Sequence, residues 1–199
     1  PARPAVVARL ARTLGVREPQ MSAAKPVLVA VADVETSAAA ESLIREYLQF
    51  IAETARSRYQ LSFDIEAMVA SDLQDKSKFY PPSGRFYVVR HAGNYVGVGC
   101  LKRLVASVAE LQRMYVRDTA RGLGVGRLLV EQLLDDARAM QFKTVRLESL
   151  RALGTAHTMY RSVGFVETAP YADNSMKKYQ SPAVMESYLA SALFMELVL

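Results

Sequence analysis

Hydrophobic positions in the first half of the chain switch from the spacing of a strand to that of helices. The apolar run at residues 27 to 34 predicts a buried strand, and Thr36 or Ser37 is the expected N-cap of the following helix. That helix is long and amphipathic, because one apolar stripe recurs at helical spacing at Leu43, Ile44, Tyr47, Leu48, Ile51 and Ala55. A shorter helix is predicted from Asp64 to Leu73, and an irregular loop at residues 81 to 84 follows it.

The second half of the chain alternates strands with helices. Two runs rich in β-branched and aromatic residues, 86 to 90 and 95 to 101, flank the turn residues of a hairpin. The pattern then predicts a strand, a helix, a strand, a helix and two strands, at residues 108 to 116, 125 to 140, 144 to 150, 156 to 163, from 165, and 193 to 199. This order predicts an α/β fold, in which helices cover a mixed sheet.

The segment from Ser175 to Ser191, between the last two predicted strands, is longer than a hairpin requires. Its apolar residues suggest one amphipathic helix. The simplest interpretation is a surface insertion, and the alternative is a lid or a homodimer contact.

Size and composition predict a single domain over residues 26 to 199. The chain has 199 residues and 51% hydrophobic content, which suffices for one buried core. No apolar run is long enough to cross a bilayer, so we expect no membrane partner. The single Cys100 excludes an internal disulfide and leaves no Cys/His spacing for a metal, so we expect a cytoplasmic setting and no metal.

The positive charge of the chain is concentrated at its start. Residues 1 to 25 carry five basic residues against Glu18, a net charge of +4, which leaves only +1 for the rest of the chain. This distribution argues against a nucleic-acid partner, since the body of the chain is nearly neutral. We expect residues 1 to 25 to be a disordered basic extension, and binding of nucleic acid by this segment is the weaker alternative.

The strongest chemical signal is the sequence Arg121-Gly122-Leu123-Gly124-Val125-Gly126-Arg127, between a predicted strand and a predicted helix. Three glycines remove side chains where backbone amides at a helix N-terminus approach an anion. The helix dipole favours the negative charge by about 0.3 to 1 kcal/mol. The pattern therefore predicts a pyrophosphate-binding loop.

Other phosphate-binding loops use the same physics but a different spacing. A nucleotide P-loop requires Gly-Lys-Ser/Thr, which is absent, and Arg127 stands where the dinucleotide fingerprint needs its third glycine. A purely structural role, in which the glycines tighten a strand-to-helix turn, is the remaining alternative.

Three motifs resemble the GNAT superfamily of N-acetyltransferases. Arg121-x-x-Gly124-x-Gly126 is similar to the acetyl-CoA signature R/Q-x-x-G-x-G/A of that family. Residues 109 to 117 resemble its fourth strand, and the run from Met159 to Phe165 resembles its L-Y-x-x-x-G-F motif. The resemblance implies a mostly antiparallel central sheet flanked by helices, with acetyl-CoA as cosubstrate.

The resemblance also implies roles for individual residues. The loop residues Arg121, Gly122, Leu123, Gly124, Val125, Gly126 and Arg127 would hold the pyrophosphate, and Met114, Tyr115 and Val116 would pair with the pantetheine arm. The amide near Val116 would polarise the thioester carbonyl. The substrate amine would attack the thioester directly, within one ternary complex and without a covalent enzyme intermediate.

Two catalytic residues follow from this resemblance. Tyr160 occupies the position that in many relatives protonates the departing thiolate, and packing beneath the cofactor is its alternative role. Glu110 is the candidate base for the amine. Strand alternation puts it on one face with Gln112, Met114 and Val116, where it faces the substrate cleft or pairs with nearby basic residues, Arg113 or Lys102.

Other candidates are weaker. We interpret His91 and His157 as surface histidines without a partner, keeping His157 as a secondary candidate, and Cys100 as a small buried hydrophobic residue. Leu153 departs from the family, because many members have an asparagine seven residues before the tyrosine.

The sequence therefore predicts an acyltransferase that moves an acetyl group from acetyl-CoA to a primary amine of a small molecule or protein. A non-catalytic acyl-CoA-binding sensor or partner module on the same fold is the alternative. The acceptor, the preferred acyl group and the oligomeric state remain open, because a fold does not define them.

Overall fold

The computed structural model describes residues 24–74, 76–172 and 182–199. Residues 1–23 of the predicted extension and 175–181 of the predicted insertion lie outside the described residues. In chain order the elements are β1 (Val27–Ala30), α2 (Val34–Tyr59), α3 (Ile65–Gln74), η1 (Lys76–Phe79), β2 (Gly84–His91), β3 (Asn94–Val105), β4 (Val108–Val116), η2 (Asp118–Ala120), α4 (Val125–Ala139), β5 (Thr144–Leu150), α5 (Gly154–Ser162), β6 (Val166–Thr168), α6 (Pro182–Ser191) and β7 (Ala192–Val198).

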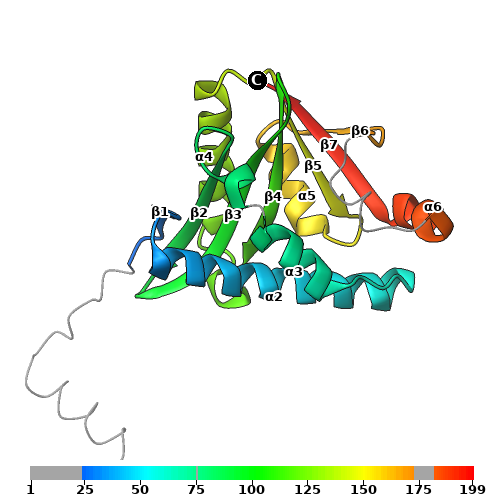
Figure 1. Cartoon of the computed structure of the whole chain (residues 1–199), viewed down its shortest axis with the longest axis horizontal. Coiled ribbons are helices and arrows are strands. Elements are labelled where there is room, and N and C mark those ends of the chain that lie inside the picture. The colour runs from blue at the N-terminus through cyan, green and yellow to red at the C-terminus, as the bar shows by residue number, and fades with distance from the viewer. Residues whose placement is uncertain (1–23, 75, 173–181) are drawn as a thin grey trace, which may run out of the picture.

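Seven strands form one sheet in the order β1-β2-β3-β4-β5-β7-β6. Neighbouring strands are antiparallel, except for the parallel pair β4 and β5. Helices α2 and α3 cover one face of the sheet, and α4 and α5 cover the other (Figure 1). The predicted α/β fold, a mostly antiparallel sheet flanked by helices, is confirmed.

The start of α2 differs from its prediction. The cap is Asp33, whose Oδ1 accepts a hydrogen bond from the amide of Thr36 at 2.8 Å, while Thr36 Oγ1 accepts one from the amide of Asp33 at 3.2 Å. This reciprocal capping box makes Thr36 the third helical residue, so the predicted N-cap at Thr36 or Ser37 is wrong. The strand before it ends at Ala30, earlier than predicted, because the chain must turn into the helix.

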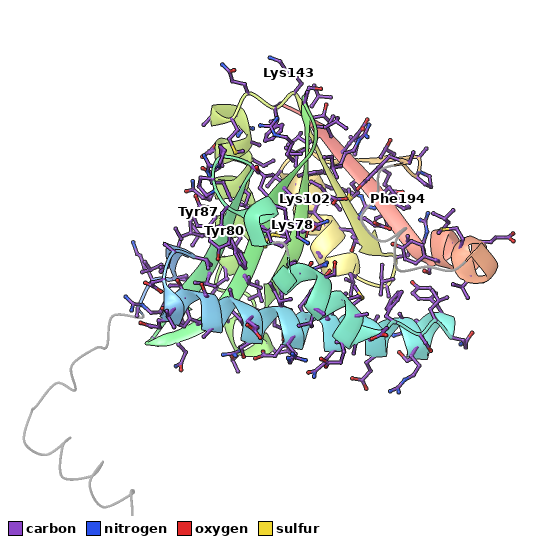
Figure 2. The ribbon with its side chains drawn as sticks, viewed as in Figure 1. Lys78, Tyr80, Tyr87, Lys102, Lys143 and Phe194 are labelled. Carbon is purple, nitrogen blue, oxygen red and sulfur yellow. The ribbon has the colours of Figure 1, made fainter. Side chains whose placement is uncertain are left out.

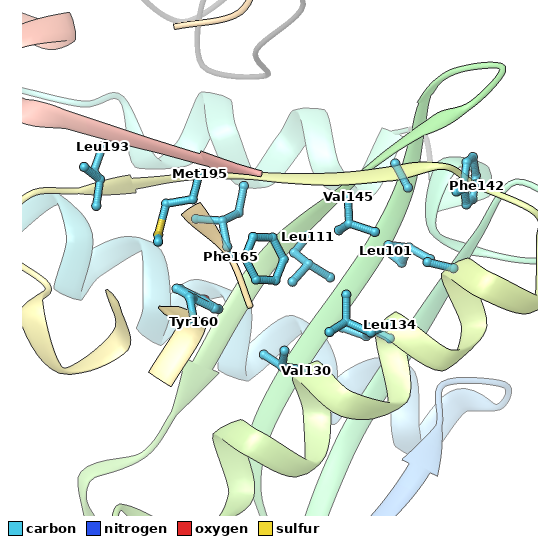
Figure 3. Close-up of a cluster of buried hydrophobic side chains, with 14 residues drawn as sticks. Leu101, Leu111, Val130, Leu134, Phe142, Val145, Tyr160, Phe165, Leu193 and Met195 are labelled. Atoms are coloured by element: carbon cyan, nitrogen blue, oxygen red, sulfur yellow. The ribbon is translucent and has the colours of Figure 1, made fainter. Parts of the chain in front are cut away.

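Two apolar layers hold the helices on the sheet. Figure 3 shows Val130 and Leu134 of α4 directed toward Leu111 of β4, with Tyr160 and Phe165 beside this cluster. On the opposite face, α2 buries the apolar stripe predicted from its helical spacing, which includes Leu43 and Leu48. This packing fixes β4 between the two layers.

β4 and β5 pair over only part of their length. Their register runs from Val108 opposite Thr144 to Leu111 opposite Leu147. β4 continues to Val116 without a further pair to β5. The two parallel strands therefore separate near the middle of the sheet, and the backbone of residues 112 to 116 lies at an open edge.

Gly84, at the start of β2, is expected to tolerate no side chain. A Cβ there would lie 2.4 Å from the carbonyl oxygens of Lys78 and Leu101. Because both are backbone atoms, relief requires a shift of η1 or β3. We expect Gly84→Ala to lower the free energy of unfolding by about 3 kcal/mol, measured by urea denaturation.

Gly154→Ala is the matched control, since a Cβ at Gly154 meets nothing within 4 Å. It should change the free energy of unfolding by less than about 0.5 kcal/mol. Equal effects of the two substitutions would show that the crowding at Gly84 is not the cause.

Candidate active site

A groove opens where β4 and β5 separate. It encloses about 530 Å³ and runs from the glycine-rich loop to α5. Nine of the ten predicted cofactor-binding residues line it: Met114, Tyr115, Val116, Arg121, Gly122, Gly124, Val125, Gly126 and Arg127. Leu123 is the exception, because its side chain points to solvent and is 45% exposed.

The glycine-rich loop forms the N-terminus of α4. Gly122 and Gly124 have φ values of 78° and 80°, a left-handed conformation that glycine adopts without strain. The helix begins at Val125, and its N-cap Gly124 offers no side chain to the first amides. Within the described residues, the backbone amides of 122 to 127 donate no hydrogen bond. They are therefore available to an anion in the groove.

Two arginines flank these amides. Arg121 Nη2 lies 2.7 Å from Asp118 Oδ1, and the guanidinium stands over the ring of Phe50 at 5.8 Å from its centre. Arg127 Nη2 donates to Ser162 Oγ at 2.7 Å, which ties the start of α4 to the end of α5. Arg127 Nη1 also lies 3.0 Å from Glu131 Oε1, and both arginines are about half-exposed, so their guanidinium groups are accessible at the mouth of the groove.

A β-bulge in β4 changes which side chains face the groove. The register with β3 skips between Cys100 opposite Gln112 and Val98 opposite Tyr115, and Arg113 has a left-handed φ of 55°. The predicted alternation of Glu110 and Gln112 with Met114 and Val116 on one face is therefore wrong. Beyond the bulge, Met114 and Val116 pack on the α4 side.

Glu110 and Gln112 face the α2 side, away from Leu111 in the core beneath α4 and α5. Gln112 Nε2 donates to Glu110 Oε2 at 2.5 Å, and the Tyr171 hydroxyl donates to Glu110 Oε1 at 2.8 Å. Lys102 Nζ lies 3.8 Å from Glu110, whereas Arg113 pairs with Asp72 instead. Of the two basic partners considered for Glu110, the structure therefore brings Lys102 to it.

A second, smaller cavity of about 80 Å³ adjoins the groove, and Glu110 lines it. Tyr47, Met114 and Tyr160 line both spaces, so the carboxylate and the groove share walls. Glu148 also lines the small cavity and accepts a hydrogen bond from the hydroxyl of Tyr188, on α6. The predicted helical insertion thereby contacts a wall of the candidate site.

Tyr160 stands at the junction of the two cavities. Its ring packs edge-on against Phe165 with 5.8 Å between ring centres. Burial raises the pKa of its hydroxyl well above the usual value for tyrosine, so the phenol stays protonated at neutral pH. Among the described residues its hydroxyl has no hydrogen-bond partner, which leaves the proton available to a ligand.

Several lining residues were not predicted as site residues. Tyr47 and Phe50 of α2 line the groove, although helical spacing explains Tyr47 equally well as core. Tyr171 and Glu148 reach Glu110 and its cavity from segments far away in the sequence. Only the folded topology brings them together, so no local motif could have identified them.

The histidine prediction needs correction. His157 is 4% exposed, and its Nε2 lies 3.1 Å from Ser149 Oγ, so it is neither at the surface nor without a partner. Burial lowers its pKa, which keeps the ring neutral. His157 lines neither cavity. Cys100, as predicted, is a fully buried thiol within the apolar layer beneath α2.

Within residues 24–74, 76–172 and 182–199, no cluster of histidine, cysteine and acidic side chains has the arrangement of a metal site. In the same part of the chain, no helix combines the length and the apolar character that crossing a membrane requires.

Known proteins are similar to this chain in sequence and in fold. Residues 45–165 match the model of the Acetyltransferase (GNAT) family. An uncharacterized N-acetyltransferase of Dictyostelium discoideum is 41% identical over 64 residues, which are 32% of this chain and 30% of that protein. The "IAA acetyltransferase" of Azospirillum brasilense is 34% identical over 109 residues, which are 54% of this chain and 71% of that protein.

The structural comparison finds the same fold in solved acetyltransferases. The PaiA N-acetyltransferase of Thermoplasma acidophilum, solved in complex with coenzyme A, superposes with a TM-score of 0.59 at 15% identity and covers 88% of this chain and 99% of that structure. This likeness concerns the fold, while the family match spans more than half of the sequence. The chain therefore belongs to the acetyltransferase (GNAT) family and is an acyltransferase.

Proposed function

We propose that this protein transfers an acetyl group from acetyl-CoA to a primary amine by direct attack within a ternary complex. One observation supports this most strongly. A single groove joins the free amides of the glycine-rich loop, the unpaired edge of β4 and the hydroxyl of Tyr160. Pyrophosphate, an extended amide-bearing arm and a thioester occur in that order along acetyl-CoA.

The residues present fit such a ligand. The amides of residues 122 to 127 and the positive end of α4 suit the pyrophosphate, with Arg121 and Arg127 at the mouth. The glycines of the loop leave space for this ligand, since a Cβ on Gly126 would lie 3.2 Å from Met159 Sδ across the groove. The open edge of β4 beyond Leu111 offers backbone groups to the pantetheine amides, as an added strand would.

The chemistry assigned to the chain uses two side chains. The amine nitrogen attacks the thioester carbonyl carbon, and the carbon–sulfur bond breaks. The amide near Val116 stabilises the developing oxyanion, and Tyr160 donates its proton to the departing thiolate. Glu110 takes the proton that the amine loses, through water if the distance requires it. Its lining of the adjoining cavity supports this role.

The acceptor is proposed only as a primary amine of a small molecule or protein. Relatives carry different names: one is an "IAA acetyltransferase", and a human protein that is 30% identical over 112 residues is an "N-acetylaspartate synthetase". This chain spans only 37% of the latter's length. The insertion beside Glu148 also shapes the acceptor side, so neither substrate is transferred to this chain.

Isothermal titration with acetyl-CoA tests the ligand. We expect binding by the parent and at least a tenfold weaker affinity for Gly124→Glu, because the carboxylate places negative charge beside the pyrophosphate. A tenfold loss corresponds to about 1.4 kcal/mol. The measurement is the dissociation constant, with circular dichroism to verify that the variant is folded.

Gly124→Gln is the matched control. Glutamine has the same size and the same left-handed backbone strain as glutamate at this φ of 80°, but no charge. We expect it to bind clearly more tightly than Gly124→Glu. Absence of binding by the parent would refute the proposed cosubstrate, and equal affinities of the two variants would refute the electrostatic role of the loop.

A further inference from the structure

A buried ion pair joins α3 to the bulge in β4. Arg113 Nε lies 2.5 Å from Asp72 Oδ2, and Arg113 Nη2 lies 3.0 Å from Asp72 Oδ1. The two side chains are 8% and 3% exposed. Lys78 adds a third contact, 3.2 Å from Asp72 Oδ1, and Figure 2 shows Lys78 close to α3. Such a bidentate ion pair fixes both the position and the orientation of the guanidinium.

The two cations of this cluster determine the ionisation state of Asp72. Burial raises the pKa of Asp72, but Arg113 and Lys78 outweigh that effect and hold the pKa below its usual value. Asp72 is therefore ionised at neutral pH. Asp72 lines neither the groove nor the adjoining cavity, so any effect on the ligand must pass through Arg113.

The backbone of Arg113 is strained. Its φ of 55° is unfavourable for any residue with a Cβ, and glycine is the residue that adopts it freely. The opposite strand accommodates the bulge, because Gly99 leaves room for Met114: a Cβ on Gly99 would lie 2.7 Å from Met114 Sδ. The ion pair with α3 therefore fixes the bulge on one face of the sheet, and the absence of a side chain at Gly99 leaves space for Met114 on the other face.

We propose that Asp72 is a positioning residue, whose ion pair with Arg113 holds the β4 bulge in the conformation that presents residues 114 to 116 to the cosubstrate. The bulge lies directly after Leu111, where pairing with β5 ends, and directly before Met114, which lines the groove. An ordinary register at Arg113 would turn the following residues to the opposite faces. This inference rests on the proposed function, because it assigns the same groove to coenzyme A.

Two double variants isolate the backbone effect. Asp72→Asn/Arg113→Ala and Asp72→Asn/Arg113→Gly both lose the ion pair, both leave Lys78 without its charged partner to the same extent, and they differ by one methyl group. We expect the alanine form to bind coenzyme A about tenfold more weakly than the parent, because a left-handed alanine is unfavourable and nothing holds it there. The glycine form should bind within about threefold of the parent, because glycine adopts that φ unaided.

Isothermal titration with coenzyme A gives the affinities, and thermal unfolding monitors the fold. A merely structural ion pair would weaken both double variants equally. Arg113→Lys is a second test, because it keeps the buried positive charge but loses the bidentate contact with Asp72. It should raise the dissociation constant for coenzyme A several-fold.

The possible failures are distinguishable. No binding of coenzyme A by the parent would overturn the proposed function and this inference with it. Binding by the parent with equal affinities of the alanine and glycine forms, or with no change in Arg113→Lys, would overturn this inference alone. Rescue by glycine but not by alanine supports it.

Discussion

Tyr160→Phe is expected to lower kcat for acetyl transfer by about 10² to 10⁴, the usual contribution of a general acid. The substitution removes only the hydroxyl and keeps the ring that packs against Phe165 in the core beneath α5. The affinity for coenzyme A should therefore stay within about threefold of the parent, since the loss falls on the transition state. Release of the free thiol measures kcat, with an acceptor found in a panel of amino acids, polyamines and amino sugars.

Tyr47→Phe is the matched control for this experiment. Tyr47 is a second tyrosine that lines both cavities, but it lies on α2 with its ring 6.1 Å from that of Tyr115. We expect its kcat to fall by less than about tenfold, because no proton transfer is assigned to it. A larger loss in Tyr47→Phe than in Tyr160→Phe would move the acid role to α2.

The raised pKa of Tyr160 determines how its role as an acid depends on pH. Because burial favours the neutral phenol, the acid form persists through the whole neutral and alkaline range in which assays are run. No alkaline fall in kcat below about pH 10 should come from Tyr160. Any such fall in the parent that also remains in Tyr160→Phe belongs to another group.

Periodicity predicted most of the fold because burial follows it directly. The strands at 108 to 116 and 144 to 150 were predicted at their observed bounds, and the apolar stripe of α2 is buried as its spacing indicated. Resemblance to a known family supplied what periodicity lacks, the direction of pairing between strands. The loop glycines were recognisable because their spacing is local.

The unpredicted features depend on contacts between distant segments. Alternation assumes an unbroken strand, whereas Arg113 leaves the regular conformation because Asp72, 41 residues earlier in the sequence, holds it. Glu110 likewise depends on Tyr171, 61 residues later in the sequence. His157 was misinterpreted for a different reason: its partner Ser149 is only eight residues earlier, but it lies on strand β5, and neither helical nor strand periodicity relates the two residues. Sequence spacing cannot predict such pairs.

Glu110→Gln is expected to lower kcat/KM by about 10² to 10⁴ near pH 7 if the carboxylate takes the proton of the amine. Glutamine keeps the shape and accepts the hydrogen bond that Tyr171 donates at 2.8 Å. Glu148→Gln is the matched control, since Glu148 is another carboxylate that lines the same cavity. We expect it to lower kcat/KM far less, because the proton is assigned to Glu110.

The pH dependence separates a base from a structural carboxylate. An amine with a pKa of about 10.4 is almost wholly protonated at pH 7, so the reaction needs a base there, but it loses this proton to the solvent as the pH approaches its pKa. The deficit of Glu110→Gln should therefore shrink from pH 7 to pH 10. A deficit caused by a structural defect would stay constant over this range. A pH-independent deficit would therefore rule out the base role. Glu110 would then be only a structural partner of Gln112, Lys102 and Tyr171.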